Sequence, residues 1–172
     1  THPESGLTTY TYDLNSNMLT RTDARGITTS FTYDALNRVT LKSYSDSTPS
    51  VSYFYDSAPG GSPITIQNPV GRLTKIATTT SGVTVTHYYS YCSCSSVERE
   101  ATVITDGTTK TYTTAYAYDY VGQLTTITYP NGKIVTYMRD NQGKETKVSS
   151  TVLGQNMDYV AAAGVGDAPS QP

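Results

Sequence analysis

Apolar and polar positions alternate along most of this chain, and pairs of aromatic residues mark the alternation. The stretch FTYDALNRV at residues 31–39 repeats the pattern of YTYDLNSNM, which begins 21 residues earlier at Tyr10. Alternate residues of a β-strand share one face, so each pair of aromatic residues predicts a strand with an aromatic side. The pairs are Tyr10/Tyr12, Phe31/Tyr33, Tyr53/Tyr55, Tyr89/Tyr91 and Tyr116/Tyr118, with weaker copies at Tyr137/Arg139 and Met157/Tyr159.

An Asp follows the second aromatic residue in several copies, and an extended segment resumes a few residues later. An Asp carboxylate can accept hydrogen bonds from the next backbone N–H groups, and Gly or Asn tolerates the positive φ that ends such a turn. Further turns that close each unit are predicted at residues 23–26, 81–82, 106–107 and 131–132. The candidate structural residues are Tyr12, Asp13, Tyr33, Asp34, Tyr55, Asp56, Tyr118, Asp119, Gly71, Gly122 and Gly143.

One such unit is a β-hairpin that cannot bury its aromatic face alone, so successive hairpins must stack. We therefore expect an all-β protein in which about seven antiparallel hairpins of about 21 residues form one continuous, curved or spiralling sheet over residues 1–160. The second Tyr of each unit should be buried in an aromatic column. Residues 57–70 read as a Pro/Gly-rich insertion, and residues 161–172 as an Ala/Gly/Pro tail or linker.

Composition supports this fold and removes several function classes. The chain has 172 residues with 16 Tyr and no Trp, and Thr and Val are abundant, which favours pleated sheets over helices. Its net charge is −2 and its Lys and Arg are scattered, so nucleic acid is not an expected partner. No apolar run approaches the roughly 20 residues that span a bilayer, so we expect no membrane insertion.

Two cysteines, Cys92 and Cys94, are separated by one residue. On a regular strand their Cα atoms would lie about 6.5 Å apart, near the limit for a disulfide, so a bridge would need a local kink. The sequence leaves open either a strained disulfide or two free, buried thiols. A metal site is disfavoured, because only His87 could join them as a ligand.

The residues that could carry catalysis do not form a convergent site in the sequence. An Asp recurring at one place in each hairpin forms a ladder along a sheet, which favours turn capping over acid–base chemistry. His87 lies among aromatic strand residues and is read as structural. Phosphate-binding loops and nucleophile elbows are absent from the sequence. We expect no enzyme, no catalytic residue and no cofactor.

The repeated Tyr-Asp units resemble the RHS or YD-repeat family, through TDARGITTSFTYDALNRV and YAYDYVGQLTTITYPNGK. The resemblance implies a spiralling antiparallel sheet, which in long members encloses a toxin domain and in animal relatives contributes to adhesion receptors. It also implies an extracellular or cell-surface location. Ser16 and Asn37 replace the turn Gly and Arg139 replaces a Tyr, so those units should be less regular.

An open sheet of this kind has two unpaired edges, which natural proteins rarely leave bare. We expect the first hairpin and the last, around residues 131–150, to carry these edges. The leading hypothesis is a secreted structural protein whose copies pair head to tail into a filament, with the tail ordered by the neighbouring copy. One alternative is a wall segment of a longer toxin-enclosing shell. A second is a carbohydrate-binding or cell-adhesion module, because sugar rings stack on exposed Tyr.

Overall fold

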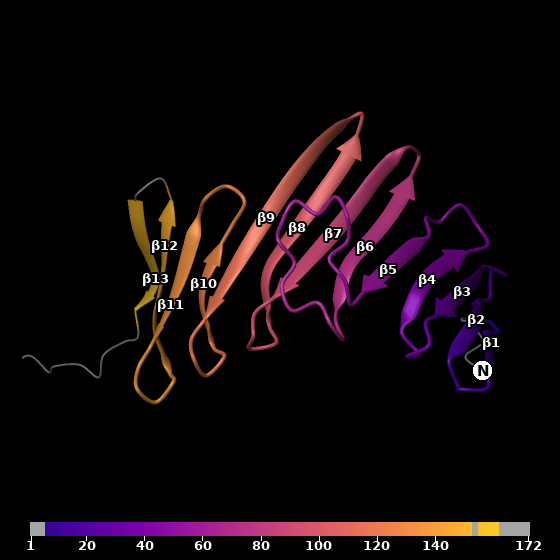
Figure 1. The fold of residues 1–172 in the computed structure, drawn as a ribbon, viewed down its shortest axis with the longest axis horizontal. Coiled ribbons are helices and arrows are strands. Elements are labelled where there is room, and N and C mark those ends of the chain that lie inside the picture. The colour runs from indigo at the N-terminus through magenta and orange to yellow at the C-terminus, as the bar shows by residue number, and fades with distance from the viewer. Residues whose placement is uncertain (1–5, 153–154, 162–172) are drawn as a thin grey trace, which may run out of the picture.

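The part of the chain that the structure describes forms one antiparallel sheet of 13 strands, which follow one another in sequence order (Figure 1). The computed structural model describes residues 6–152 and 155–161. The strands are β1 (Thr9–Tyr12), β2 (Met18–Thr22), β3 (Thr28–Tyr33), β4 (Val39–Tyr44), β5 (Val51–Tyr55), β6 (Leu73–Thr80), β7 (Val83–Tyr91), β8 (Val97–Asp106), β9 (Thr108–Tyr118), β10 (Leu124–Thr128), β11 (Ile134–Arg139), β12 (Glu145–Val152) and β13 (Gln155–Ala161).

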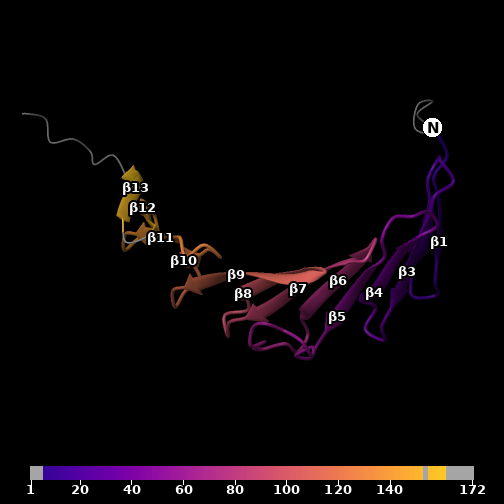
Figure 2. The ribbon, with the colours of Figure 1, turned by 90° about the horizontal axis from the view of Figure 1, so that it is seen from above.

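The sheet is open and bends along its length, with both ends rising on the same side (Figure 2). The predicted all-β fold of stacked hairpins in one curved sheet is confirmed. The bend has a local cause that recurs in each unit. Where the aromatic strand meets its returning strand, the register shifts by one residue, as between Tyr33↔Val39 and Thr32↔Leu41. Such bulges increase the local twist of a strand pair. Equivalent shifts occur at Tyr12, Tyr55, Tyr91, Tyr118 and Arg139.

The hydrophobic core is small and lies beside the connection between β5 and β6. Residues 56–72 of this connection fold back over β7 and β8, on the convex side of the sheet (Figures 1 and 2). Ile64 packs there against Tyr88 and Ala101, all three less than a tenth exposed. The Gln67 amide donates to Ser90 Oγ at 3.0 Å. The predicted insertion therefore supplies a cover for one face of the central strands.

Two expectations are corrected by the fold. The second Tyr is only half-buried at Tyr33, Tyr55, Tyr91 and Tyr118 and is exposed at Tyr12, because the described residues form one open sheet with no second layer to cover it. The far edge is β13, not the hairpin at residues 131–150, since β12 pairs with β13. Cys92 and Cys94, for which the sequence left a kinked disulfide or free thiols open, lie in the turn after β7. Of the predicted tail at residues 161–172, Ala161 ends β13 and residues 162–172 lie outside the described residues.

Candidate functional site

The turn that follows each Tyr-Asp dipeptide is built around the Asp carboxylate. Asp34 Oδ1 accepts from the Leu36 amide at 2.9 Å and the Arg38 amide at 3.0 Å. The Asp34 amide donates to the Arg38 carbonyl, and the Asn37 amide donates to the Asp34 carbonyl. This arrangement holds both ends of a four-residue turn. Asp13, Asp23, Asp119 and Asp140 accept from the amides two and four residues later in the same way.

The residue three positions after the Asp has a positive φ in each of these turns. Gly122 has φ 83° and Gly143 has φ 81°, and Gly71 also has a positive φ of 76°. Ser16 and Asn37 adopt the same conformation, at 65° and 61°. The expected irregularity at these two positions is therefore wrong, because the Asp contacts hold the turn even without Gly.

The second aromatic residue of each unit reaches back to the unit before it. The Tyr33 hydroxyl donates to the Met18 carbonyl at 2.8 Å, and Met18 is the first residue of the preceding returning strand. We call these contacts the cross-repeat bonds. The others run from Tyr55 to Val39, Tyr91 to Leu73 and Tyr118 to Val97, at 2.9, 2.7 and 2.7 Å. Each unit is thus tied to its predecessor through a side chain as well as through the backbone ladder.

Arg139 makes the equivalent cross-repeat bond with a guanidinium instead of a phenol. Its guanidinium donates to the Leu124 carbonyl at 2.5 Å, and Leu124 begins β10. A second N–H donates to Glu145 at 2.8 Å. The unit that lacks the expected Tyr therefore keeps its cross-repeat bond, contrary to the irregularity predicted from the sequence.

A second contact between units comes from the arginines just before two of the returning strands, β4 and β6. The Arg38 guanidinium lies 4.4 Å from the Tyr55 ring centroid and pairs with both Asp34 and Asp56. Arg72 lies 5.0 Å from the Tyr91 ring in the next unit. These arginines were missed as site residues, although the repeated Arg before a Val or Leu was a usable signal.

Asp56 departs from the other Asp residues. Its carboxylate accepts from the Gly71 amide at 2.6 Å, across the whole β5–β6 connection. Asp56 itself has a φ of 68°. The carboxylate therefore closes the insertion at its far end, because the insertion displaces the amides that would otherwise follow it.

Cys92 and Cys94 are joined by a disulfide in the β7–β8 turn, with their Cα atoms 5.1 Å apart. The Cys92 amide donates to the Ser96 carbonyl, and the Ser95 amide to the Cys92 carbonyl, as in the Asp turns. Cys92 therefore occupies the position of the Asp. The covalent bond links the residues that the carboxylate–amide contact links elsewhere.

The electrostatics of the site follow from these hydrogen bonds. The Arg38 amide and guanidinium lower the pKa of Asp34 below its ordinary value of 3.8, against a smaller opposing effect of desolvation. The pKa of Asp56 is lowered by the Arg38 side chain and the Gly71 amide. Burial, and then the hydrogen bond from Tyr116 to Glu100 at 2.7 Å, raise the pKa of the Tyr116 phenol. The carboxylates are stabilised in their ionised form, which suits turn capping.

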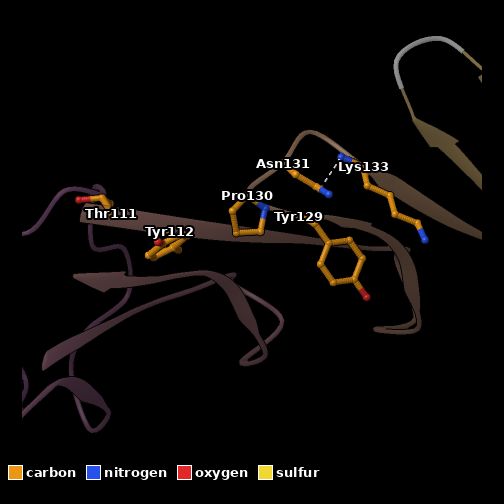
Figure 3. Close-up of a pocket in the computed structure, with 6 residues that line it drawn as sticks. All are labelled: Thr111, Tyr112, Tyr129, Pro130, Asn131 and Lys133. Carbon is orange, nitrogen blue, oxygen red and sulfur yellow. Dashed lines mark hydrogen bonds between the residues drawn. The ribbon is translucent and has the colours of Figure 1, made fainter. Parts of the chain in front are cut away.

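One apolar cavity lies beside the long strand β9. It has a volume of about 510 Å³ and is lined by Thr111 and Tyr112 of β9 and by residues of the β10–β11 turn (Figure 3). The turn residues are Tyr129, Pro130, Asn131 and Lys133. The sequence indicated only the turn at residues 131–132 and not the cavity, because the two segments are brought together only by the sheet.

The described residues show few features of other site classes. Across residues 6–152 and 155–161, no three His, Cys, Asp or Glu side chains gather as a metal site. His87 Nδ1 lies 3.1 Å from the Thr102 hydroxyl, as a structural contact between β7 and β8. Within the same ranges, no helix has the length and apolar character needed to cross a bilayer.

Comparison with known proteins gives one family and several similar structures. A crystal structure of TcdB2-TccC3-Cdc42 matches with a TM-score of 0.70 at 16% identity, over 94% of this chain and 9% of that chain. The Photorhabdus luminescens Tc holotoxin pore, with a substituted TccC3, matches with a TM-score of 0.70 at 17% identity and the same coverage. This chain thus spans about a tenth of the length of the matched chains, and no curated protein matches it.

At these identities the matched structures show a shared fold. The family assignment rests on the sequence itself: the model of the Teneurin YD-shell family matches residues 2–159. That range contains every Asp turn and cross-repeat bond described above. The chain belongs to the Teneurin YD-shell family.

Proposed function

We propose that this chain is a non-enzymatic structural segment of a YD-repeat shell wall, at the cell surface or outside the cell. The family assignment and the fold shared with Tc toxin complexes support a wall role. In this proposal residues 1–160 form the repeat wall and residues 161–172 a tail or linker. The Asp carboxylates serve the turns, and their hydrogen bonds to backbone amides leave them little capacity for acid–base chemistry.

The observation that carries this proposal is the cross-repeat bond. Tyr or Arg side chains hold the preceding unit at five positions of the described sheet, Tyr33, Tyr55, Tyr91, Tyr118 and Arg139. Tyr12, by contrast, lies on the edge strand β1. Tyr12 occupies the equivalent register position, opposite Met18, and is 57% exposed. A preceding repeat would place a carbonyl at the Tyr12 hydroxyl and a strand beside β1.

A fusion tests this continuation directly. A second copy of the β3–β4 hairpin, joined ahead of β1 through a copy of residues 23–27, should extend the sheet and raise the free energy of unfolding. Replacing Tyr12 by Phe in the fusion should remove about 1 kcal/mol of that gain, the typical net value of a hydrogen bond. The same change in the unextended chain is the matched control and should have little effect. Equal stability of the fusion and the original chain would contradict the proposal.

A filament of identical copies uses the same two edges, and the sheet-edge argument also favours it. In that arrangement β13 of one copy pairs with β1 of the next. Sedimentation velocity over a range of concentrations separates the two forms. Growth of open-ended oligomers by the unextended chain favours the filament, and a monomer at all concentrations favours the wall segment. A glycan-binding or adhesion role is the remaining alternative, supported only by exposed Tyr side chains.

A further inference from the structure

Strand β9 is longer than its neighbour β10, and this leaves an unpaired strand edge in the middle of the sheet. β8 pairs with β9 from Thr108 to Ala115, whereas β10 pairs only with residues 115–118. Among the described residues, no strand lies beside residues 108–114 on the β10 side. Figure 1 shows the β8–β9 arm projecting past the β10–β11 hairpin.

The direction of the backbone groups on this edge follows from the turn after β9. The Asp119 amide donates to the Gln123 carbonyl, so Asp119 directs its backbone groups toward β10. Because these groups alternate sides along an antiparallel strand, Thr113, Thr111 and Thr109 also direct theirs to the β10 side. Past Ala115, where β10 ends, these three residues present donors and acceptors to an open slot.

The apolar cavity described above lies along this open edge. Thr111 and Tyr112 are consecutive, so their side chains belong to opposite faces of the strand, yet both line the cavity. The cavity is therefore at the edge of β9 and not on one face. Across the slot, Tyr129 and Pro130 supply its opposite wall (Figure 3). Tyr112 and Tyr129 are 45% and 40% exposed, which leaves apolar surface for a ligand.

We propose that this slot binds an extended polypeptide segment, which adds to β9 as an antiparallel or parallel strand and places one apolar side chain in the cavity. Backbone pairing supplies affinity in this mode, and a pocket for alternate side chains supplies selectivity. Lys110 next to the edge favours an acidic residue beside the apolar one. A volume of about 510 Å³ accommodates an aromatic side chain.

The slot is separate from the edges that the wall proposal uses. The β10–β11 turn, closed by the bond from the Gly132 amide to the Tyr129 carbonyl, ends the hairpin beside residues 108–114. A neighbouring repeat added at β1 or β13 therefore leaves this slot unfilled. The two proposals can be tested independently, and either can fail alone.

The test uses a fluorescein-labelled nonapeptide in which Glu alternates with Val around a central Phe. Anisotropy should show saturable binding to the full chain, and hydrogen exchange should show new protection at Thr109, Thr111 and Thr113. Thr111→Pro removes an edge N–H without removing a β8 ladder bond, and should weaken binding about tenfold or more. Thr111→Ala, which keeps the N–H, is the matched control and should bind within about twofold of the original chain.

Two further comparisons separate strand addition from other modes. Tyr129→Ala should weaken binding, whereas Tyr120→Ala, which changes a Tyr that is 99% exposed and outside the cavity lining, should not. A peptide N-methylated at alternate residues should lose binding, because it cannot form the ladder. Unchanged affinity of Thr111→Pro, with its circular dichroism spectrum intact, would overturn the proposal. So would binding of chitohexaose but not of the peptide, since that would indicate a sugar site on the tyrosines.

Discussion

At the scale of single residues, the same carbonyl position is satisfied by two different side chains. Tyr118 reaches the Val97 carbonyl with a phenol, and Arg139 reaches the Leu124 carbonyl with a guanidinium. Both are long side chains with a terminal donor, and both start at the register shift of their unit. The requirement at this position is therefore a donor of sufficient reach, and aromatic character adds packing to it.

Removing only the hydroxyl separates these two contributions. Tyr118→Phe should lower the free energy of unfolding by about 1 kcal/mol, the net value of one hydrogen bond, while Tyr118→Ala should cost about 2–3 kcal/mol because it also removes half-buried packing. Urea denaturation measures both. Tyr120→Phe is the control, since Tyr120 is 99% exposed. If Tyr118→Phe and Tyr120→Phe had equal stability, the cross-repeat bond would carry no net energy.

The turn carboxylates make stability dependent on acid pH. The pKa of Asp34 is lowered in the folded state by the Arg38 amide and guanidinium, and the pKa of Asp13 is lowered chiefly by Asn17. These carboxylates therefore stabilise the folded state fully at a pH above 3.8, the ordinary pKa of Asp. This stabilisation is lost as the pH falls through their lower pKa values in the folded state. The urea concentration at the denaturation midpoint should not change with pH near pH 6 and should decrease below about pH 4. In Asp34→Asn the acid-induced loss should be smaller, and an identical pH profile would contradict this assignment.

At the scale of the elements, the four-residue turn is the unit that repeats most faithfully. Gly122 has a φ of 83°, and a Cβ added there would meet no atom within 4 Å. Gly122→Ala should therefore cost about 1 kcal/mol through backbone conformation alone. Ser16→Gly should raise the free energy of unfolding, because Ser16 has a φ of 65°, which Gly adopts without strain. Thermal denaturation of the two variants checks both signs, and a stabilising Gly122→Ala would show that the turn can change its conformation.

At the scale of the whole molecule, each repeat unit within the described residues pairs only with its neighbours, as in other repeat proteins. The best-covered region is where residues 56–72 lie on β7 and β8, and it contains Tyr88 and Ala101 at 5% and 1% exposure. All residues of β1 are exposed. Hydrogen exchange should therefore be slowest in β7 and β8 and fastest in β1. Uniform protection along the sheet would mean that it unfolds as one cooperative unit.

The chain by itself determined the strands, the turns and their stacking, because these depend on local chemistry. Period-two aromatic pairs select extended strands, Asp at a fixed offset caps the turn that follows, and Asp34 and Asp119 lie where the pattern indicated. The same pattern overstated the burial of Tyr33 and Tyr118, since alternation marks a face but does not say whether a second layer covers it.

The tertiary structure alone decided what depends on contacts between distant segments. The fold pairs Arg38 with Asp56 and packs Ile64 against Tyr88. It also leaves residues 108–114 of β9 with an unpaired edge beside the β10–β11 turn. These features follow from strand lengths and from the path of the β5–β6 connection. A local pattern specifies how each hairpin closes, but the difference in length between two neighbouring strands appears only when their register is known.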